Sequence, residues 1–335
     1  MDLTEDQLVD AIRTLLSGEA PGVVVGIGDD AAVVETGHGQ TVLTTDMLVE
    51  GVHFERSYVS AADLGYKSMV VNVSDIAAMG ASPRHAVVSL ALSPEVDEGW
   101  VVGLYGGMRD ACAEYALSLI GGDLNRAPAV VVAVTVTGEV AAGRAVERSG
   151  ARPGDRIVVT GELGASAGGL LVGQKGSAEL GGALASEWAR ELVRAHLRPV
   201  ARVGEGQTLA QAGASAMMDL SDGLAKDLSR LCSASGSGAR VSLPAVPVAG
   251  ALREGALALG IDPLALAISG GEDYELLATI DPSAVRTVAS ELKERFGVTL
   301  TDIGTIVEGS GLVTVDAGGR EATLEPKGWD HFAER

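Results

Sequence analysis

Apolar residues recur with two different periods along the first half of the chain. In residues 61–80 they return at helical spacing, as Leu64, Met69 and Val73 illustrate. From 130 to 136, by contrast, valine occupies every second position, which is typical of a half-buried strand. The same criteria predict helices at 4–18, 61–80 and 96–116 and strands at 23–27, 41–45, 86–92, 117–121 and 129–139.

A polar, turn-rich segment from Arg148 to Asp155 interrupts these elements and predicts a domain boundary at residue 148. The elements after it do not follow regular βαβ alternation, so an α+β enzyme of two domains fits better than a Rossmann fold or a TIM barrel. The expected strands are 156–160, 214–219, 239–243, 272–280, 300–307 and 311–315, and the expected helices are 165–173, 185–197, 200–212, 222–234, 247–258 and 284–295.

Composition narrows the classes of partner. The chain has 335 residues, a hydrophobic content of 47% and a net charge of −20, which argues against nucleic acid or an anionic membrane as the partner. An alternative explanation is that proteins of the source organism generally have acidic surfaces that keep them solvated. Cys112 and Cys232 are isolated, which favours a reducing cytoplasm over a disulfide scaffold or a zinc site. We see no apolar leader at the N-terminus and no membrane-spanning stretch of roughly 18 apolar residues.

Carboxylates beside Gly, Ser or Thr follow several of the apolar runs. They are Asp29-Asp30, Asp46, Asp123 and Asp219, with Asp75 in a helical stretch. If these side chains converge, they would form a site for hard cations and for phosphate behind them. Taken one at a time, each has an ordinary explanation as a solvated turn, and Ser221 or Asp222 could simply cap the helix at 222–234. In the same way, Lys67 is expected on the surface, His53 in a loop, and Arg148 as a linker charge.

The common nucleotide-binding motifs are missing from the sequence. It contains no GxxxxGK[ST] loop, no complete dinucleotide fingerprint, no kinase HRD and DFG set, no GxSxG and no HExxH. If this chain handles ATP, it does so outside the common nucleotide folds.

Eight segments, taken in order, resemble the thiamine-monophosphate kinase family, which belongs to the aminoimidazole ribonucleotide synthetase superfamily. They span nearly the whole chain: GIGDDAAVV (26–34), TTDMLVEGVHF (44–54), GYKSMVVNVSDIAAMGASP (65–83), GGDLNR (121–126), RSGARPGD (148–155), MDLSDGL (218–224), SGGEDYEL (269–276) and KGWDHF (327–332). Any one string would be weak, whereas eight in order are highly specific and outweigh the ordinary explanations above.

The resemblance implies a fold, a dimer and a reaction. It implies a mixed sheet with helices in an N-terminal domain, 1–148, that binds ATP and Mg²⁺ and forms a homodimer. A C-terminal α/β domain, 149–335, would complete the site. The implied reaction is phosphorylation of thiamine monophosphate by ATP to thiamine diphosphate, assisted by several Mg²⁺ ions.

The resemblance also implies roles for individual residues. The implied metal ligands are Asp30, Thr44, Thr45, Asp46, Asp75, Asp123, Asp219 and Asp222; the implied ATP contacts are Tyr105, Gly122, Asp123, Arg148 and Ser221; and the implied substrate contacts are His53, Glu272 and Trp329. Tyr105 matches only loosely. Thr44-Thr45 replaces a Ser-Thr pair of relatives, and Trp329 stands where relatives often have Tyr or Phe.

We expect direct transfer without a general base, because the acceptor phosphate is already ionised near neutral pH. Other enzymes of the superfamily remain alternatives: aminoimidazole ribonucleotide synthetase, selenophosphate synthetase and a hydrogenase-maturation dehydratase. Outside the superfamily, the alternative is a non-catalytic, acidic cation-binding protein.

Overall fold

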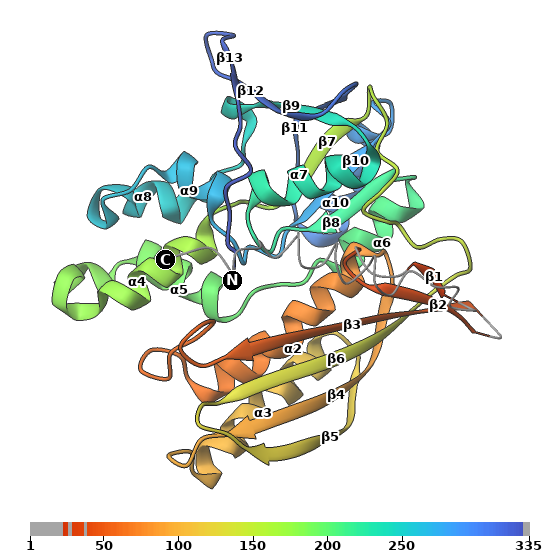
Figure 1. The fold of residues 1–335 in the computed structure, drawn as a ribbon. Helices are drawn as coiled ribbons and strands as arrows, with labels where there is room; N and C mark the ends of the chain where they lie inside the picture. The colour runs from red at the N-terminus through yellow and green to blue at the C-terminus, as the bar shows by residue number, and fades with distance from the viewer. Residues whose placement is uncertain (1–22, 26–28, 37–38, 331–335) are drawn as a thin grey trace, which may run out of the picture.

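A computed structural model describes residues 23–25, 29–36 and 39–330. Two sheets with their helices lie one above the other in Figure 1, the N-terminal half below and the C-terminal half above. The expected helix at 4–18 and the last two residues of the expected strand at 23–27 lie outside the described residues. No helix among those described is long and apolar enough to cross a bilayer.

The N-terminal half contains a six-stranded sheet in the order β1-β2-β3-β6-β4-β5, in which β4 and β5 are parallel and the other pairs antiparallel. The sheet is therefore mixed, as expected. Its strands and the two helices behind it are β1 (Val23–Val25), β2 (Ala32–Thr36), β3 (Gly39–Val49), β4 (Ser82–Leu92), β5 (Ser118–Arg126), β6 (Val131–Val140), α2 (Ala61–Ala78) and α3 (Glu98–Glu114).

The valine alternation of β6 sets which face of this sheet is covered. Val132, Val134 and Val136 are fully buried on the face that packs against α2 and α3, and the residues between them are half-exposed on the other face. α3 approaches α2 closely because both helices carry glycine at the crossing. A Cβ on Gly65 would lie 1.9 Å from the carbonyl oxygen of Leu104. The tight crossing leaves α2 almost wholly buried.

The C-terminal half contains a seven-stranded sheet in the order β13-β12-β9-β11-β7-β10-β8. Its strands are β7 (Arg156–Thr160), β8 (Ala216–Asp219), β9 (Gly238–Ser242), β10 (Leu276–Ile280), β11 (Leu300–Val307), β12 (Gly311–Val315) and β13 (Glu321–Thr323). Its helices are α4 (Ala165–Leu180), α5 (Glu187–Leu197), α6 (Val203–Gln211), α7 (Leu224–Ser235), α8 (Gly250–Leu259), α9 (Pro263–Ser269) and α10 (Val285–Phe296), with short 3₁₀ turns η1 (Gly181–Ala185) and η2 (Leu243–Ala245).

Several predicted boundaries were wrong, and two of them affect the site. β3 extends to Val49, so Asp46 lies inside a strand rather than at its end, because β3 pairs with β6 along its whole length. β5 continues to Arg126, which places Gly121, Gly122 and Asp123 inside an edge strand rather than in a turn after it. β2, α9 and β13 were not predicted.

Candidate active site

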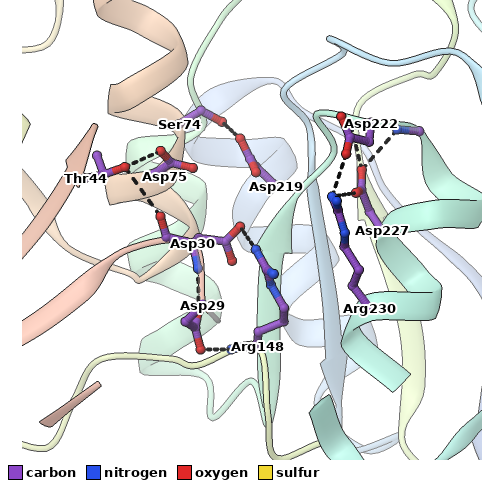
Figure 2. Close-up of polar contacts among 11 residues, drawn as sticks. Asp29, Asp30, Thr44, Ser74, Asp75, Arg148, Asp219, Asp222, Asp227 and Arg230 are labelled. Carbon is purple, nitrogen blue, oxygen red and sulfur yellow. Dashed lines mark hydrogen bonds and ion pairs between the residues drawn. The ribbon is translucent and has the colours of Figure 1, made fainter. Parts of the chain in front are cut away.

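Three carboxylates from distant parts of the chain converge between the two halves of the molecule. Asp30 lies in the turn before β2, Asp75 in α2 and Asp219 at the end of β8. One carboxylate oxygen from each lies within 4.8 Å of the others. Figure 2 shows the three side chains facing a common point. The N-terminal half thus supplies two members of this carboxylate cluster, and the C-terminal half supplies the third.

Hydroxyl groups hold two of these carboxylates in place. The Thr44 hydroxyl donates to Asp75 Oδ2 at 2.6 Å, and the Ser74 hydroxyl donates to Asp219 Oδ2 at 2.5 Å (Figure 2). Asp46 lies beside the cluster on β3, where its backbone N–H donates to the side chain of Asn72 at 3.0 Å. The two hydroxyl bonds orient the carboxylates of Asp75 and Asp219 before any ligand arrives.

The carboxylates of the cluster are buried and repel one another, and a bound cation would relieve that repulsion. Burial, and then repulsion by Asp46 and other neighbouring carboxylates, raises the pKa of Asp75 well above its usual range. Burial raises the pKa of Asp219 in the same way, with repulsion by Asp30 adding to it. Asp30 Oδ2 is buried and has no hydrogen-bond partner among the described residues. Oxygen ligands in this arrangement fit Mg²⁺ or another hard divalent cation.

Arg148 lies beside the carboxylate cluster, which excludes its ordinary explanation as a solvated linker charge, and its expected contact with ATP stays a prediction. Its guanidinium Nη2 donates to Asp30 Oδ1 at 2.7 Å, and its backbone N–H donates to Asp29 Oδ2 at 2.9 Å. The guanidinium is mostly buried. Arg148 therefore compensates part of the negative charge of the turn before β2.

Asp222 faces the site and does not cap α7. Its carboxylate pairs with Arg230 at 2.6 Å and with Lys226 at 3.1 Å. The residue that satisfies the start of α7 is Asp227, whose Oδ2 accepts from the backbone N–H groups of Asp222 and Gly223 (Figure 2). The helix begins at Leu224 after Gly223, whose φ of +113° favours glycine. The ordinary explanation of Ser221 or Asp222 as the cap of this helix therefore does not apply, and their expected contacts with ATP and metal stay predictions.

A cavity of about 630 Å³ lies against the carboxylate cluster. It brings together eight of the residues expected in the site: Asp46, His53, Asp75, Asp219, Ser221, Asp222, Glu272 and Trp329. His53 follows β3, and its Nδ1 accepts from the backbone N–H of Val49 at 3.0 Å. Trp329, 38% exposed, closes one wall through a backbone N–H that donates to the carbonyl of Asp222 at 3.1 Å. The cavity therefore joins an acidic wall to a wall with ring and carboxylate side chains.

Two family models match the chain over most of its length. The N-terminal domain of AIR synthase related protein matches residues 28–140, and its C-terminal domain matches residues 152–316. The thiamine-monophosphate kinase of Escherichia coli strain K12 is 41% identical over 315 residues, which cover 93% of each chain. That of Aquifex aeolicus is 37% identical and covers 99% of each chain. This chain belongs to the thiamine-monophosphate kinase family.

Solved structures agree with this membership and confirm the expected fold. The structure of AaThiL complexed with AMPPCP and TMP covers 99% of both chains, with 35% identity and a TM-score of 0.84. Thiamine-monophosphate kinase from Stenotrophomonas maltophilia covers 96% of this chain and 98% of its own, with 36% identity and a TM-score of 0.76. The hydrogenase maturation protein HypE in complex with ATP, at 20% identity, shares the fold alone. The domain boundary at residue 148 lies between the two matched segments and stays a prediction.

Four residues expected from the family resemblance lie neither on the cavity wall nor at the carboxylate cluster. Thr45 points to the opposite face of β3 from Thr44, and its hydroxyl donates to the carbonyl of Val134 at 3.0 Å. Tyr105 packs on α3 against the core of the N-terminal half. Gly122 and Asp123 lie on the edge strand β5, where Asp123 accepts from Asn125 at 2.5 Å.

The strand register gives the distance of β5 from the carboxylate cluster. Asp46 pairs with Val134, Val134 with Val88, and Val88 with Gly122, so Gly122 lies three strands away in the same row. At about 4.8 Å per strand, that separation is about 14 Å. The assignment of Tyr105, Gly122 and Asp123 to the site stays a prediction.

Lys67 is buried beside the cavity residue Glu272, so its expected place on the surface was wrong. It is 4% exposed, not on the surface, and its Nζ lies 2.9 Å from Oε1 of Glu272. His196 on α5 lies on the other side of the same carboxylate, with Nδ1 at 3.4 Å from Oε2. One signal was available: Lys67 stands eight residues before Asp75 on α2, a spacing that returns to the same helix face.

Proposed function

We propose that this chain transfers the γ-phosphoryl group of ATP to the phosphate of thiamine monophosphate, which gives ADP and thiamine diphosphate. This would be the final step of thiamine diphosphate biosynthesis. The observation that carries the proposal is the carboxylate cluster of Asp30, Asp75 and Asp219 beside a cavity large enough for a substrate. The relatives' activity supports the choice of substrate, as does the match to a structure that holds AMPPCP, an ATP analogue, and TMP.

The residues expected to hold Mg²⁺ fit that ion. Asp30, Asp75 and Asp219 would share it, with Asp46 and Asp222 at the cavity wall and the Thr44 hydroxyl beside Asp75. When bound, several Mg²⁺ ions would supply neutralisation of the phosphate charges and alignment of the two substrates. Ser74 and Thr44 keep the carboxylates oriented, and Arg148 offers phosphate a planar, fork-shaped donor.

The reaction needs no general base from the protein. The acceptor is a phosphate monoester, whose second pKa is about 6, so its oxygens are ionised at neutral pH. We therefore expect direct in-line transfer without a phosphorylated enzyme. The work of the chain is to place two polyanions in line while it carries a net charge of −20 itself.

The opposite wall of the cavity would hold the thiamine part of the acceptor. Trp329 offers a ring for stacking, and Glu272 offers a carboxylate. His53 uses Nδ1 as an acceptor toward Val49, so the neutral ring carries its proton on Nε2. The acceptor would therefore lie between these three residues and the carboxylate cluster.

A homodimer would account for the residues that lie away from the cavity. No element among residues 39–330 covers the outer face of the N-terminal sheet, which carries exposed apolar side chains, among them Leu43, Met47 and Val87. Monomers rarely leave such a face open. We propose that two copies pair through it, and that Tyr105, Gly122 and Asp123 of one copy act at the site of the other.

The decisive experiment is an ADP-release assay with Mg²⁺ and ATP across four acceptors: thiamine, thiamine monophosphate, hydroxymethylpyrimidine phosphate and formylglycinamidine ribonucleotide. We expect turnover with thiamine monophosphate only. Turnover with formylglycinamidine ribonucleotide would point to an aminoimidazole ribonucleotide synthetase instead. No turnover with any acceptor, together with cation binding by calorimetry, would favour the non-catalytic protein.

A further inference from the structure

Arg230 is the one lysine or arginine side chain that the described residues place on the wall of the 630 Å³ cavity. It extends from α7, and its Nη1 lies 2.6 Å from Asp222 Oδ2 and 3.4 Å from Asp227 Oδ1 (Figure 2). The side chain of Arg230 keeps 19% of its surface exposed, whereas that of Asp227 is fully buried. A ligand in the cavity can therefore reach this guanidinium.

Asp222 shares one carboxylate oxygen between two cations. Its Oδ2 accepts from Arg230 and also lies 3.1 Å from the Nζ of Lys226. Asp222 lines the same cavity as the carboxylate cluster but is not one of its three members. Mg²⁺ prefers negatively charged oxygen ligands, and a carboxylate that is already paired with two cations attracts it less. An ion that takes Asp222 therefore has to displace at least one of these pairs.

The backbone that carries Asp222 is held in place by the neighbouring segment. The carbonyl of Ser221 accepts from the N–H of Glu272 at 2.7 Å, and the carbonyl of Leu220 accepts from the N–H of Tyr274 at 3.0 Å. These main-chain bonds do not depend on what pairs with the carboxylate. A change of partner at Asp222 therefore has to come from a side chain that moves rather than from the loop.

Of the two cations, Arg230 is the one that can turn toward a ligand. Lys226 also donates to the backbone carbonyl of Trp329, and its side chain keeps only 8% of its surface exposed. Arg230 lies on the cavity wall and still has the carboxylate of Asp227 close by when it leaves Asp222. Its planar guanidinium can donate two parallel hydrogen bonds to a phosphate group.

We propose that Arg230 is a phosphate-binding residue: it pairs with Asp222 until Mg²⁺ takes that carboxylate, and it then donates to a phosphate oxygen of ATP or of thiamine monophosphate. This assignment rests on the proposed function and adds a residue to the set that the family resemblance implies. In the exchange, one arginine–carboxylate pair is replaced by a metal–carboxylate contact and an arginine–phosphate pair. Binding of the metal at Asp222 and binding of the phosphate are thereby coupled.

Calorimetry on the full chain tests the proposal through three affinities: for Mg²⁺ alone, for AMPPCP at saturating Mg²⁺, and for thiamine monophosphate at saturating Mg²⁺. In Arg230→Met, Mg²⁺ alone should bind about threefold or more tighter, because the guanidinium no longer competes for Asp222. The substrate whose phosphate Arg230 contacts should bind about tenfold or more weakly. A loss for AMPPCP assigns the contact to ATP, a loss for thiamine monophosphate assigns it to the acceptor, and a loss for both places Arg230 between the two phosphates.

The opposite directions of these shifts separate this role from a structural one. If Arg230 only holds Asp222 in place, Arg230→Met will weaken Mg²⁺ and both substrates together. An Mg²⁺ affinity that is unchanged or weaker overturns the exchange, and unchanged affinities for both substrates overturn the phosphate contact. Adding Arg230→Met to Asp222→Asn should give no gain in Mg²⁺ affinity, because the competition is for Asp222.

The matched control is Arg240→Met. It breaks an Arg–Glu pair of 2.9 Å with Glu321 on the C-terminal sheet, outside the cavity. All three affinities should stay as in the wild type.

Asp222→Asn tests the exchange without any change at Arg230, and it decides if Arg230→Met does not fold. It should weaken Mg²⁺ alone by less than about threefold, and weaken Mg²⁺ in the presence of AMPPCP by about tenfold or more. Equal losses with and without AMPPCP overturn the proposal, because Asp222 would then be an open ligand from the start. These measurements need binding and not turnover, so a failed kinase activity in the ADP-release assay and a failed assignment of Arg230 give different results.

Discussion

The two sheets of the molecule differ in how many of their faces are covered. In the C-terminal half, Ile157 and Val159 of β7 face one hydrophobic core and Val158 faces another, because helices pack on both sides. In the N-terminal half, β6 buries every second valine beneath α2 and leaves the residues between them half-exposed. The sequence carries the same contrast: β7, β8 and β10 are nearly continuous apolar runs, whereas β6 alternates.

Because of this difference, the two sheets offer different parts of their surface to a ligand or to a second copy of the chain. A sheet that is closed on both faces can offer only its strand ends and loops to a ligand, and Asp219 and Asp222 lie there. A sheet with one open face can supply ligands from the covered side, where Asp46 and Asp75 lie, and still present the other side to a second copy. Substitutions at the shared site should therefore lower activity in either half, whereas only substitutions on the open face of the N-terminal sheet should weaken the homodimer.

The largest loss of activity should come from changes on the two sides of the proposed metal site. Asp46→Asn in the N-terminal half and Asp222→Asn in the C-terminal half should each lower kcat at least about 100-fold, because each removes a negatively charged oxygen from the expected metal set. Circular dichroism should show an unchanged fold. Near-normal turnover of either variant at saturating Mg²⁺ would refute the assignment of that residue.

An intermediate effect should come from a charge placed on the open face of the N-terminal sheet, and a matched charge on the C-terminal half should have no such effect. Leu43→Lys places a charge on the uncovered face of the N-terminal sheet and should weaken the homodimer about tenfold or more, measured by analytical ultracentrifugation. Because we expect the second copy to supply part of the site, activity should fall as dimer is lost. The matched control is Leu257→Lys on α8, at a side chain that is 94% exposed in the C-terminal half. If both variants behave alike, the open face is not the interface.

The smallest effect should be a pH dependence of the stability against unfolding, caused by buried carboxyl groups at and near the junction of the two halves. Burial raises the pKa of Asp29 to about 6 and that of Asp227 to about 7, and Asp75 and Asp219 shift in the same direction. Unfolded carboxyls lose their protons near pH 4, so the metal-free fold retains protons that the unfolded chain has lost. Stability therefore falls as pH rises from about 4 to 7.

Without Mg²⁺, we expect the melting temperature at pH 8 to lie about 2 °C or more below that at pH 6, by calorimetry. Saturating Mg²⁺ should shrink the difference, because the ion replaces the protons at the cluster. Sodium chloride at matched ionic strength is the control. A difference that grows with Mg²⁺ would contradict a metal site at this junction.

The spacing of apolar residues and the positions of turn residues predicted most helices and strands, because both are properties of short segments of the chain. It missed β2 and cut β5 short, since both depend on pairing with a neighbouring strand rather than on their own residues. The convergence of Asp30, Asp75 and Asp219 is a long-range property that no local period contains, and only the resemblance of ordered motifs suggested it. Lys67 was misplaced because a lysine in a helix is usually solvated, and its partner lies 205 positions further along the chain.

The backbone hydrogen bonds from Glu272 and Tyr274 to Ser221 and Leu220 also set the spacing between two parts of the cavity wall. They tie the segment that carries Glu272, on the cavity wall, to the segment that carries Asp219 and Asp222. The separation between the Glu272 wall of the cavity and the carboxylate cluster is then fixed by main-chain hydrogen bonds rather than by movable side chains. If the proposed function holds, we expect this fixed spacing to select an acceptor by its length as well as by the groups at its two ends.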